Sequence, residues 1–374
     1  MAHAYSPGLK VTESMTVRKR RILPIEGEVL VQVGQELLPD DVVARTDLPG
    51  KAELQNVAGR LGLAPEEVPD CMLKKGGEYV EKGEPLAMAK SFFGLFKSVA
   101  VANSSGTIEN VNKITGQVLL RGAPIPVEVK AYLSGKVIEV EPNQGCTVET
   151  RAAFIQGIFG IGGETNGILK VVCESPDQML SEDLITNELA GKVIVGGSLV
   201  TASALKKAIE NKIAGVVAGG FHDKDLKEFL GYDLGVAITG HEEFGITLII
   251  TEGFGEIQMA NRTFELFKKH EGDLACINGA TQIRAGVIRP EVVIPTKEQV
   301  VETVKEHEIR GLEIGTPVRV IRAPYFGLLG TISALPPEPM VLESGSKARI
   351  LEVSLLKDGR KVIVPRANVE TIEE

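Results

Sequence analysis

The sequence predicts a multidomain, β-rich α+β protein, and three observations lead to that prediction. Sequence segments with the pattern of a strand, a turn and a second strand recur between residues 25 and 171. Between residues 172 and 294, continuous β-branched runs closed by glycine alternate with segments of helix length, which is typical of βαβ units. Short alternating strands with glycine turns fill the C-terminus. The expected divisions are an N-terminal arm (1–24), a β region (25–171), an α/β domain (172–294), a helical linker (295–311) and a C-terminal barrel (312–374).

Composition narrows the class of protein further. Hydrophobic residues make up 43% and charged residues 24% of the chain, as in soluble globular proteins. The net charge of −9 argues against broad binding to a phosphate backbone. No apolar run approaches the ~20 residues of a spanning helix, and no signal-peptide pattern opens the sequence. We therefore expect a cytoplasmic location and no membrane span.

The four cysteines are widely spaced and form no CxxC pair. Structural zinc needs clustered ligands, so we interpret these thiols as buried or idle groups in a reducing compartment. We predict no resident metal and no cofactor.

The β region begins after a basic cluster, Arg18–Arg21, that interrupts the N-terminal arm. Such a cluster contacts nucleic acid or an acidic partner in some proteins, but it is more often a solvated edge. Beyond it, the phrases at residues 27–34, 106–111 and 135–140 each read as a strand leading into a turn. Repeated phrases of this kind predict hairpins that close a small barrel or sandwich.

Part of the β region resembles the biotinyl/lipoyl-type domains, which have a barrel-sandwich hybrid fold. The resemblance is carried by Gly77–Leu86 and by Ala102–Ile108. In a carrier domain of this family one lysine stands at the tip of a hairpin, and Lys90, two residues after Met88, is its counterpart here. The second flanking methionine is missing and the sequence FFGLF follows. The resemblance therefore favours a structural or partner-contacting hairpin, with a lysine carrier or redox-complex subunit as the alternative.

The α/β domain offers a candidate ligand site at the ends of its strands. Helices are expected over residues 201–211, 223–230 and 257–269. In an open α/β sheet, ligands bind outside the carboxyl ends of the strands. We refer to this place as the strand-end crevice. Its candidate residues are Ser198, Thr201, His222, Asp223, His241, Glu242 and Glu252.

Several chemistries fit this crevice. The helix N-terminus after Gly196–Ser198 would accept an anion, although neither a P-loop nor a Rossmann fingerprint is present. His222 and His241 with nearby carboxylates suit a divalent ion, and His241 suits a general base. Histidine at a strand end more often hydrogen-bonds to a neighbouring loop, so we assign neither a metal nor a catalytic residue.

The C-terminal segment Gly315–Ile332 resembles a KOW motif, the signature of small SH3-like barrels in ribosomal proteins and transcription-elongation factors. Alternating valines lead to a Pro-aromatic-Gly turn, and a second glycine follows three residues later. The resemblance implies binding of RNA or protein through the loop around the aromatic residue. The matching positions are Arg319, Arg322, Tyr325 and Phe326. Residues 312–374 contain eight basic and eight acidic residues, so the electropositive face typical of RNA binding is missing and a protein partner is favoured at least equally.

The leading functional hypothesis is a non-enzymatic scaffold or interaction protein, associated with the transcription or translation machinery through the KOW-like barrel. Both recognisable modules bind other molecules, and no catalytic constellation is specific. The first alternative is a small-ligand-binding protein or enzyme that uses the strand-end crevice. The second is a carrier or redox-complex subunit that uses Lys90. A protein partner is expected, with RNA as the alternative partner, and the sequence does not determine the oligomeric state.

Overall fold

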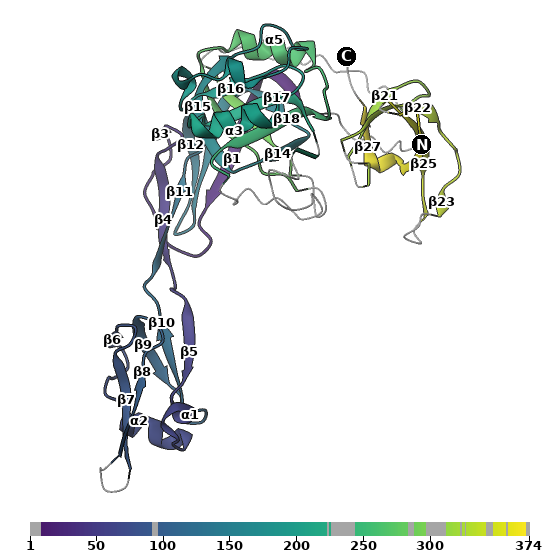
Figure 1. Cartoon of the computed structure of the whole chain (residues 1–374). Coiled ribbons are helices and arrows are strands. Elements are labelled where there is room, and N and C mark those ends of the chain that lie inside the picture. Colours follow the sequence, from purple (N-terminus) through teal and green to yellow (C-terminus); the bar gives the residue numbers. More distant parts are fainter. Residues whose placement is uncertain are drawn as a thin grey trace.

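The structure is a computed structural model that describes residues 9–91, 96–222, 224–225, 244–282, 288–296, 312–321, 324–325, 327–341, 347–356 and 358–371. Figure 1 shows a body, a narrow module carried at its far end, and a C-terminal domain beside the body. Strands dominate all three parts, which confirms the β-rich α+β class. None of the described helices is both long and apolar enough to cross a membrane.

The body contains an 11-stranded sheet, and strand β13 organises its antiparallel half. β13 pairs with β1 along almost its whole length, with β12 near its start and with β20 near its end. One face of this half packs over a core that includes Val148, Phe154 and Val293. The strands are β1 (Val11–Ile22), β3 (Glu36–Leu37), β12 (Gly135–Glu141), β13 (Gly145–Gln156), β19 (Leu274–Asn278) and β20 (Glu291–Pro295).

The N-terminal arm expected over residues 1–24 is therefore a strand over much of its length. Residues 11–22 form β1, which joins the sheet by pairing with β13. The segment was expected to be a loose arm, whereas residues 11–22 pair antiparallel with β13. In the folded chain the charged residues of this segment find partners on the neighbouring strands, so the segment is free to pair.

The other half of the sheet is parallel and covered by helices. β15 to β18 run parallel to one another, with β14 antiparallel at the edge. β16 and β17 are buried along their whole length, as continuous apolar runs predict. The elements are β14 (Phe159–Ile161), β15 (Glu164–Val171), η2 (Glu182–Leu184), η3 (Asn187–Leu189), β16 (Val193–Val195), α3 (Ala202–Glu210), β17 (Gly215–Phe221), β18 (Thr247–Phe254) and α5 (Asn261–Lys269).

The two halves share strand β15, so the sheet runs across the division expected at residue 171. Residues 164–168 of β15 pair antiparallel with β19, and residues 169–171 pair parallel with β16. The change of sequence pattern near residue 171 thus marks the point where one sheet changes from antiparallel to parallel pairing. A single strand, β15, pairs with neighbours of both directions.

The distal module lies at the end of a strand-built stalk (Figure 1). The stalk consists of β2 (Glu28–Val29), β4 (Val42–Leu48) and β11 (Ile125–Lys130) in a three-stranded sheet. The module has a four-stranded sheet, a separate hairpin and its own core, all of whose buried members lie between Val57 and Leu120. Its elements are β5 (Ala52–Asn56), α1 (Val57–Leu61), η1 (Pro65–Glu67), α2 (Val68–Cys71), β6 (Tyr79–Val80), β7 (Pro85–Ser91), β8 (Phe96–Val101), β9 (Gly106–Val111) and β10 (Gln117–Arg121).

The C-terminal domain is a five-stranded antiparallel sheet of order β26-β25-β22-β21-β27 with its own small core. A two-stranded hairpin, β23–β24, extends from it. Its elements are β21 (Pro317–Val320), β22 (Leu329–Ala334), β23 (Met340–Val341), β24 (Lys347–Ala348), β25 (Ile350–Leu355), β26 (Lys361–Pro365), η4 (Arg366–Asn368) and β27 (Val369–Thr371).

Candidate functional site

The first part of the strand-end crevice is occupied by the chain itself. Ser198 is buried, and its hydroxyl donates to the carbonyl of Asp177 at 2.8 Å. Thr201 is the N-cap of α3 and accepts a hydrogen bond from the amide of Ala204 at 3.1 Å. Both side chains therefore bind backbone groups of the same chain.

The glycines that close these strands allow backbone segments to pack without intervening space. A Cβ added to Gly197 would lie 2.2 Å from the carbonyl oxygen of Gln178, and one added to Gly220 would lie 1.9 Å from that of Gly255. An L side chain at either position would clash with backbone. The glycines after β16 thus allow backbone segments to pack closely. These contacts give no support to the binding of an anion at the N-terminus of α3.

Three candidates of the crevice, Asp223, His241 and Glu242, lie outside the described residues, as does the strand-like run at 236–238. His222 is described and exposed at the end of β17. Within the described ranges, no group of three or more His, Cys, Asp and Glu side chains is placed to hold a metal ion.

Glu252, the remaining candidate, leads to the C-terminal domain. It lies near the carboxyl end of β18, where its Oε1 accepts from the amide of Ala260 at 3.1 Å. Its Oε2 accepts from Nη2 of Arg319 at 2.8 Å. Arg319 is one of the residues that the KOW resemblance singled out, so one candidate from each predicted site meets the other in the folded chain.

Four side chains form a charge cluster at this junction: Glu252, Arg319, Glu370 and Arg289. Arg319 Nη1 donates to Glu370 Oε1 at 3.0 Å, and Arg289 Nη2 donates to Glu370 Oε2 at 2.5 Å. The contacts run from Glu252 to Arg319, then to Glu370 and then to Arg289, so that negative and positive side chains alternate. Arg319 and Glu370 come from adjacent strands β21 and β27, while Glu252 and Arg289 belong to the body. We refer to these four residues as the junction cluster.

The centre of the junction cluster is withdrawn from water. Glu370 is 1% exposed and Arg319 3% exposed. Charges buried to this degree are tolerated when they are paired, because an unpaired charge would lose its hydration without compensation. Arg319 Nε is buried and has no hydrogen-bond partner among the described residues. The pairing is therefore extensive but incomplete.

Backbone contacts surround the junction cluster. A Cβ added to Gly253 of β18 would lie 2.5 Å from the carbonyl oxygen of Gly327, in the turn between β21 and β22. Gly327 itself has a φ of 78° and faces the ring of Phe254. Ile321 packs against the core of the body. Gly327, in the turn that resembles the KOW binding loop, thus lies against the end of β18.

The other KOW positions are only partly described. Arg319 lies in strand β21, which places it beside the turn and not within it. Tyr325 is half-buried, packs against the domain core and has the guanidinium of Arg360 5.9 Å from its ring centroid. Arg322 and Phe326 lie outside the described residues.

The carrier position Lys90 lies in β7, opposite Lys97 of β8 in the hairpin register. Its side chain and residues 92–95 lie outside the described part of the chain. On the same hairpin Met88 stands opposite Val99, and both Val99 and Val101 are exposed.

The basic cluster Arg18–Arg21 is neutralised within the molecule. Each of its four residues forms an ion pair with a glutamate from another part of the body: Arg18 with Glu149, Lys19 with Glu291, Arg20 with Glu141 and Arg21 with Glu164. The charges of the cluster are therefore paired within the molecule, while the side chains of Arg18 and Arg20 stay 65% and 61% exposed, as on a solvated edge.

Sequence reasoning missed Tyr132, which lies at the centre of these pairs. Its hydroxyl donates to Glu291 Oε1 at 3.1 Å, and its ring lies 5.5 Å from the guanidinium carbon of Arg21. Burial, and then the negative charge of Glu291, raise the pKa of Tyr132 well above its ordinary value. Tyr132 also has a φ of 68°, an uncommon value for a residue with a side chain. Nothing in the local sequence pattern signals this conformation.

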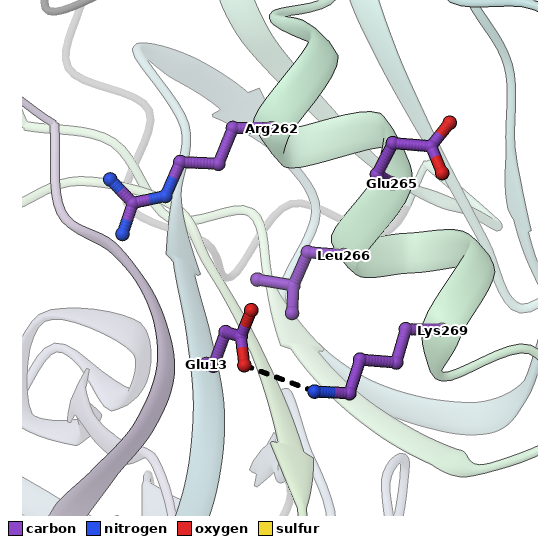
Figure 2. Close-up of a pocket in the computed structure, with 5 residues that line it drawn as sticks. All are labelled: Glu13, Arg262, Glu265, Leu266 and Lys269. Atoms are coloured by element: carbon purple, nitrogen blue, oxygen red, sulfur yellow. Dashed lines mark hydrogen bonds and ion pairs between the residues drawn. The ribbon is translucent and has the colours of Figure 1, made fainter. Parts of the chain in front are cut away.

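A pocket of about 340 Å³ lies between β1 and α5 (Figure 2). Arg262, Leu266 and Lys269 extend from α5 toward Glu13, whereas Glu265 points away from it. Glu13 and Lys269 form an ion pair at 3.0 Å, and the hydrogen bond from Lys269 lowers the pKa of Glu13. The charges of the four ionisable lining residues balance, and the interaction between Glu13 and Lys269 gives the pocket a structural explanation.

No protein-family model matches this chain, and no curated protein sequence is significantly similar to it.

Proposed function

We propose that this chain is a non-enzymatic scaffold that joins protein partners, with the distal module and the C-terminal domain as its two contact regions. The observation that carries the proposal is the distal module, which has a hydrophobic core of its own and lies away from the body on strands β4 and β11 (Figure 1). An independent core at the end of a stalk suits presentation to another molecule better than it suits enclosure of a substrate.

The hairpin β7–β8 is the part of the module that we propose contacts a partner. Val99 and Val101 alternate along β8 and so lie on one face, with Met88 opposite Val99. Val99 is 44% exposed, and Lys97 and Ser98 beside it are exposed as well. An apolar strip with a polar border is the composition expected of a protein contact site.

The C-terminal domain supports the second half of the proposal through its resemblance to KOW modules. That resemblance suggests an SH3-like barrel attached to the transcription or translation machinery. Two observations favour protein over RNA as the partner: the balance of charges in residues 312–374, and the burial of Arg319 in ion pairs. RNA remains an outcome of the test below.

The alternative of a small-ligand site or enzyme in the strand-end crevice draws no support from the described residues. Ser198, Thr201 and Glu252 are each engaged by other groups of the chain. We therefore propose a single function.

The test is crosslinking and quantitative capture of partners from native cells with the full chain as bait. The double variant Val99→Glu and Val101→Glu should lose at least ten-fold of the captured partner, because two charges would have to be buried in the contact. Ile168→Glu is the matched control, since Ile168 is a similarly exposed strand residue of the body. Equal capture by the unmodified chain, the double variant and the Ile168→Glu control would reject the proposed hairpin contact. Binding of RNA alone, in a parallel gel-shift assay, would reject a protein partner.

A further inference from the structure

Strand β8 of the distal module has one edge that no other strand covers. Among the described residues β8 pairs only with β7, and the two strands form a sheet of their own. The open edge of a strand presents a row of N–H and C=O groups to which another extended chain can pair. The hydrogen bonds of the hairpin identify the residues that present these groups.

The bonds at the end of β8 fix the direction in which its backbone groups point. The amide of Ala102 donates to the carbonyl of Glu84 at 2.8 Å, and the carbonyl of Ala102 accepts from the amide of Gly83 at 2.8 Å, so both groups face the β7 side. The backbone groups of successive strand residues point to alternate sides, and β8 contributes one residue to every step of the register. The backbone groups of Lys97 and Val99 therefore face away from β7.

The contacts of Val101 confirm this direction and close one end of the edge. Its carbonyl accepts from Nε2 of Gln55 at 2.6 Å and from Nη1 of Arg60 at 3.1 Å, and both donors lie outside the hairpin. Farther along β8, no hydrogen bond within the described part of the chain engages the outward backbone groups of Val99 and Lys97. The open edge thus extends from Val99 to Lys97.

The side chains beside the open edge indicate what kind of chain fits it. Lys97 and Val99 lie two positions apart on one face of β8, and both are exposed. Lys97 forms no ion pair with any described residue, and the register places a second lysine, Lys90, opposite it. The facing position of the hairpin therefore supplies no acidic residue. An acidic side chain of a partner would balance the charge of Lys97.

We propose that the open edge of β8 binds an extended peptide segment of the partner, which adds to the hairpin as a third strand and places an acidic residue beside Lys97 and an apolar residue beside Val99. The inference rests on the proposed function and specifies how the hairpin makes its contact. Backbone hydrogen bonds supply affinity, and the two side chains supply selectivity. Because Lys97 and Val99 share a face, the peptide must also carry its apolar and acidic residues two positions apart.

Binding of synthetic peptides to the full chain tests this spacing. The probes are three sets of short peptides with the patterns apolar-x-acidic, apolar-x-basic and apolar-x-x-acidic, measured by fluorescence anisotropy. The third set keeps the charge of the first but puts the two side chains on opposite faces of an extended strand. The first set should bind at least ten-fold more tightly than either of the others. Equal binding by all three sets, or no binding by the first, would overturn the proposal.

Hydrogen exchange distinguishes backbone pairing from a contact of side chains alone. The tightest peptide of the first set should slow exchange of the amides of Lys97 and Val99 at least ten-fold, because both become hydrogen-bonded. The amides of Ser98 and Ala100 face β7 and should change little. Peptide binding without protection of Lys97 and Val99 would exclude a third strand. Protection without peptide, together with a doubled mass at high protein concentration, would assign the edge to a second copy of this chain and equally overturn the proposal.

Val99→Pro tests the edge from the side of this chain. Proline removes the outward N–H and leaves the bonds to β7 in place, which is why proline is tolerated on strand edges. Val99→Thr is the matched control, since it keeps the β-branched shape and the N–H. The proline variant should bind the peptide at least ten-fold more weakly than the threonine variant, with unchanged exchange in the core of the module. Equal binding by the two variants would contradict pairing at the edge.

Methylated peptides repeat this test without any change to the protein. N-methylation of every second amide of the tightest peptide, in each of the two phases, blocks one edge of the peptide at a time. One phase should weaken binding at least ten-fold and the other much less, since only one edge of the peptide pairs with β8. Equal effects of the two phases would overturn the proposal even where Val99→Pro disturbs the module.

Partner capture separates this inference from the proposed function. If the double variant Val99→Glu and Val101→Glu loses the captured partner while Val99→Pro keeps it, the contact uses side chains alone. The third strand then fails and the proposed function stands. If the glutamate double variant keeps the partner as well, the hairpin contact of the proposed function fails.

Discussion

At the scale of single residues, many of the described side chains that drew attention in the sequence bind other parts of the same chain. The four consecutive basic residues at 18–21 form four separate ion pairs, and Arg319 lies between two glutamates. These charged residues, which the sequence suggests are free to bind other molecules, thus form ion pairs within the chain. Their removal should affect stability as well as binding.

Arg319→Gln should destabilise the protein by about 3–5 kcal/mol, because it leaves Glu370 buried with less compensation. Urea-induced unfolding of the full chain, followed by hydrogen exchange of the C-terminal domain, measures the loss. Lys361→Gln removes an exposed partner of Glu352 and should cost about 1 kcal/mol or less. Similar losses in both variants would contradict the assignment of Arg319 to a buried network.

The cysteines should differ in reactivity. Burial raises the pKa of Cys276 to about 12 and that of Cys173 to about 11, so at pH 8 roughly one thiol in a thousand or fewer is ionised at these positions. Iodoacetamide should label the half-buried Cys71 first in the native protein, as mass spectrometry of digested samples would reveal. All four cysteines should react in guanidinium chloride, and rapid native labelling of Cys276 would contradict its burial.

At the scale of secondary-structure elements, sequence patterns predicted several boundaries closely. The helix expected at 201–211 spans Ala202–Glu210, and its N-cap Thr201 is a residue type that favours that position. The helix expected at 257–269 begins only at Asn261, because Met259 donates to the carbonyl of Pro176 and Ala260 donates to Glu252. Those long-range bonds hold the segment extended, and no local pattern predicts them.

Thr201→Ala should destabilise the body by about 0.5–2 kcal/mol, since the amide of Ala204 loses its capping acceptor. Ser181→Ala provides the control, because Ser181 precedes η2 without a side-chain capping bond. Thermal unfolding of both variants gives the comparison. If both substitutions lower the stability by the same amount, the capping hydrogen bond of Thr201 contributes nothing specific to the stability of the body.

At the scale of the whole molecule, the described chain is a set of separate cores joined by strands and charge pairs. The distal module, the C-terminal domain and the two halves of the body each bury their own apolar residues. Disturbance of one core should therefore remain local to a large extent, which is a property of domains with few shared contacts.

Leu120→Ala should destabilise the distal module by about 2–5 kcal/mol, because Leu120 is fully buried in its core. Hydrogen exchange should rise in residues 52–121 and stay unchanged in residues 350–371. Leu351→Ala, in the core of the C-terminal domain, should produce the reverse pattern. Uniform acceleration throughout the chain by either substitution would indicate a single cooperative unit.

Patterns of hydrophobicity and glycine in the sequence determined the strand-rich class, the parallel strands β16 to β18 and the strand-rich C-terminal segment, because period and burial are properties of each segment alone. Tertiary structure decided which groups meet: Arg18 pairs with a residue 131 positions away, and Arg319 with one 67 positions away. Ion pairs between distant strands depend on how sheets assemble, and a charge in a sequence has the same appearance whether it faces water or a partner. For that reason Glu252 of the crevice and Arg319 of the KOW-like segment were visible as candidates in the sequence, whereas their meeting at the junction was visible only in the folded chain.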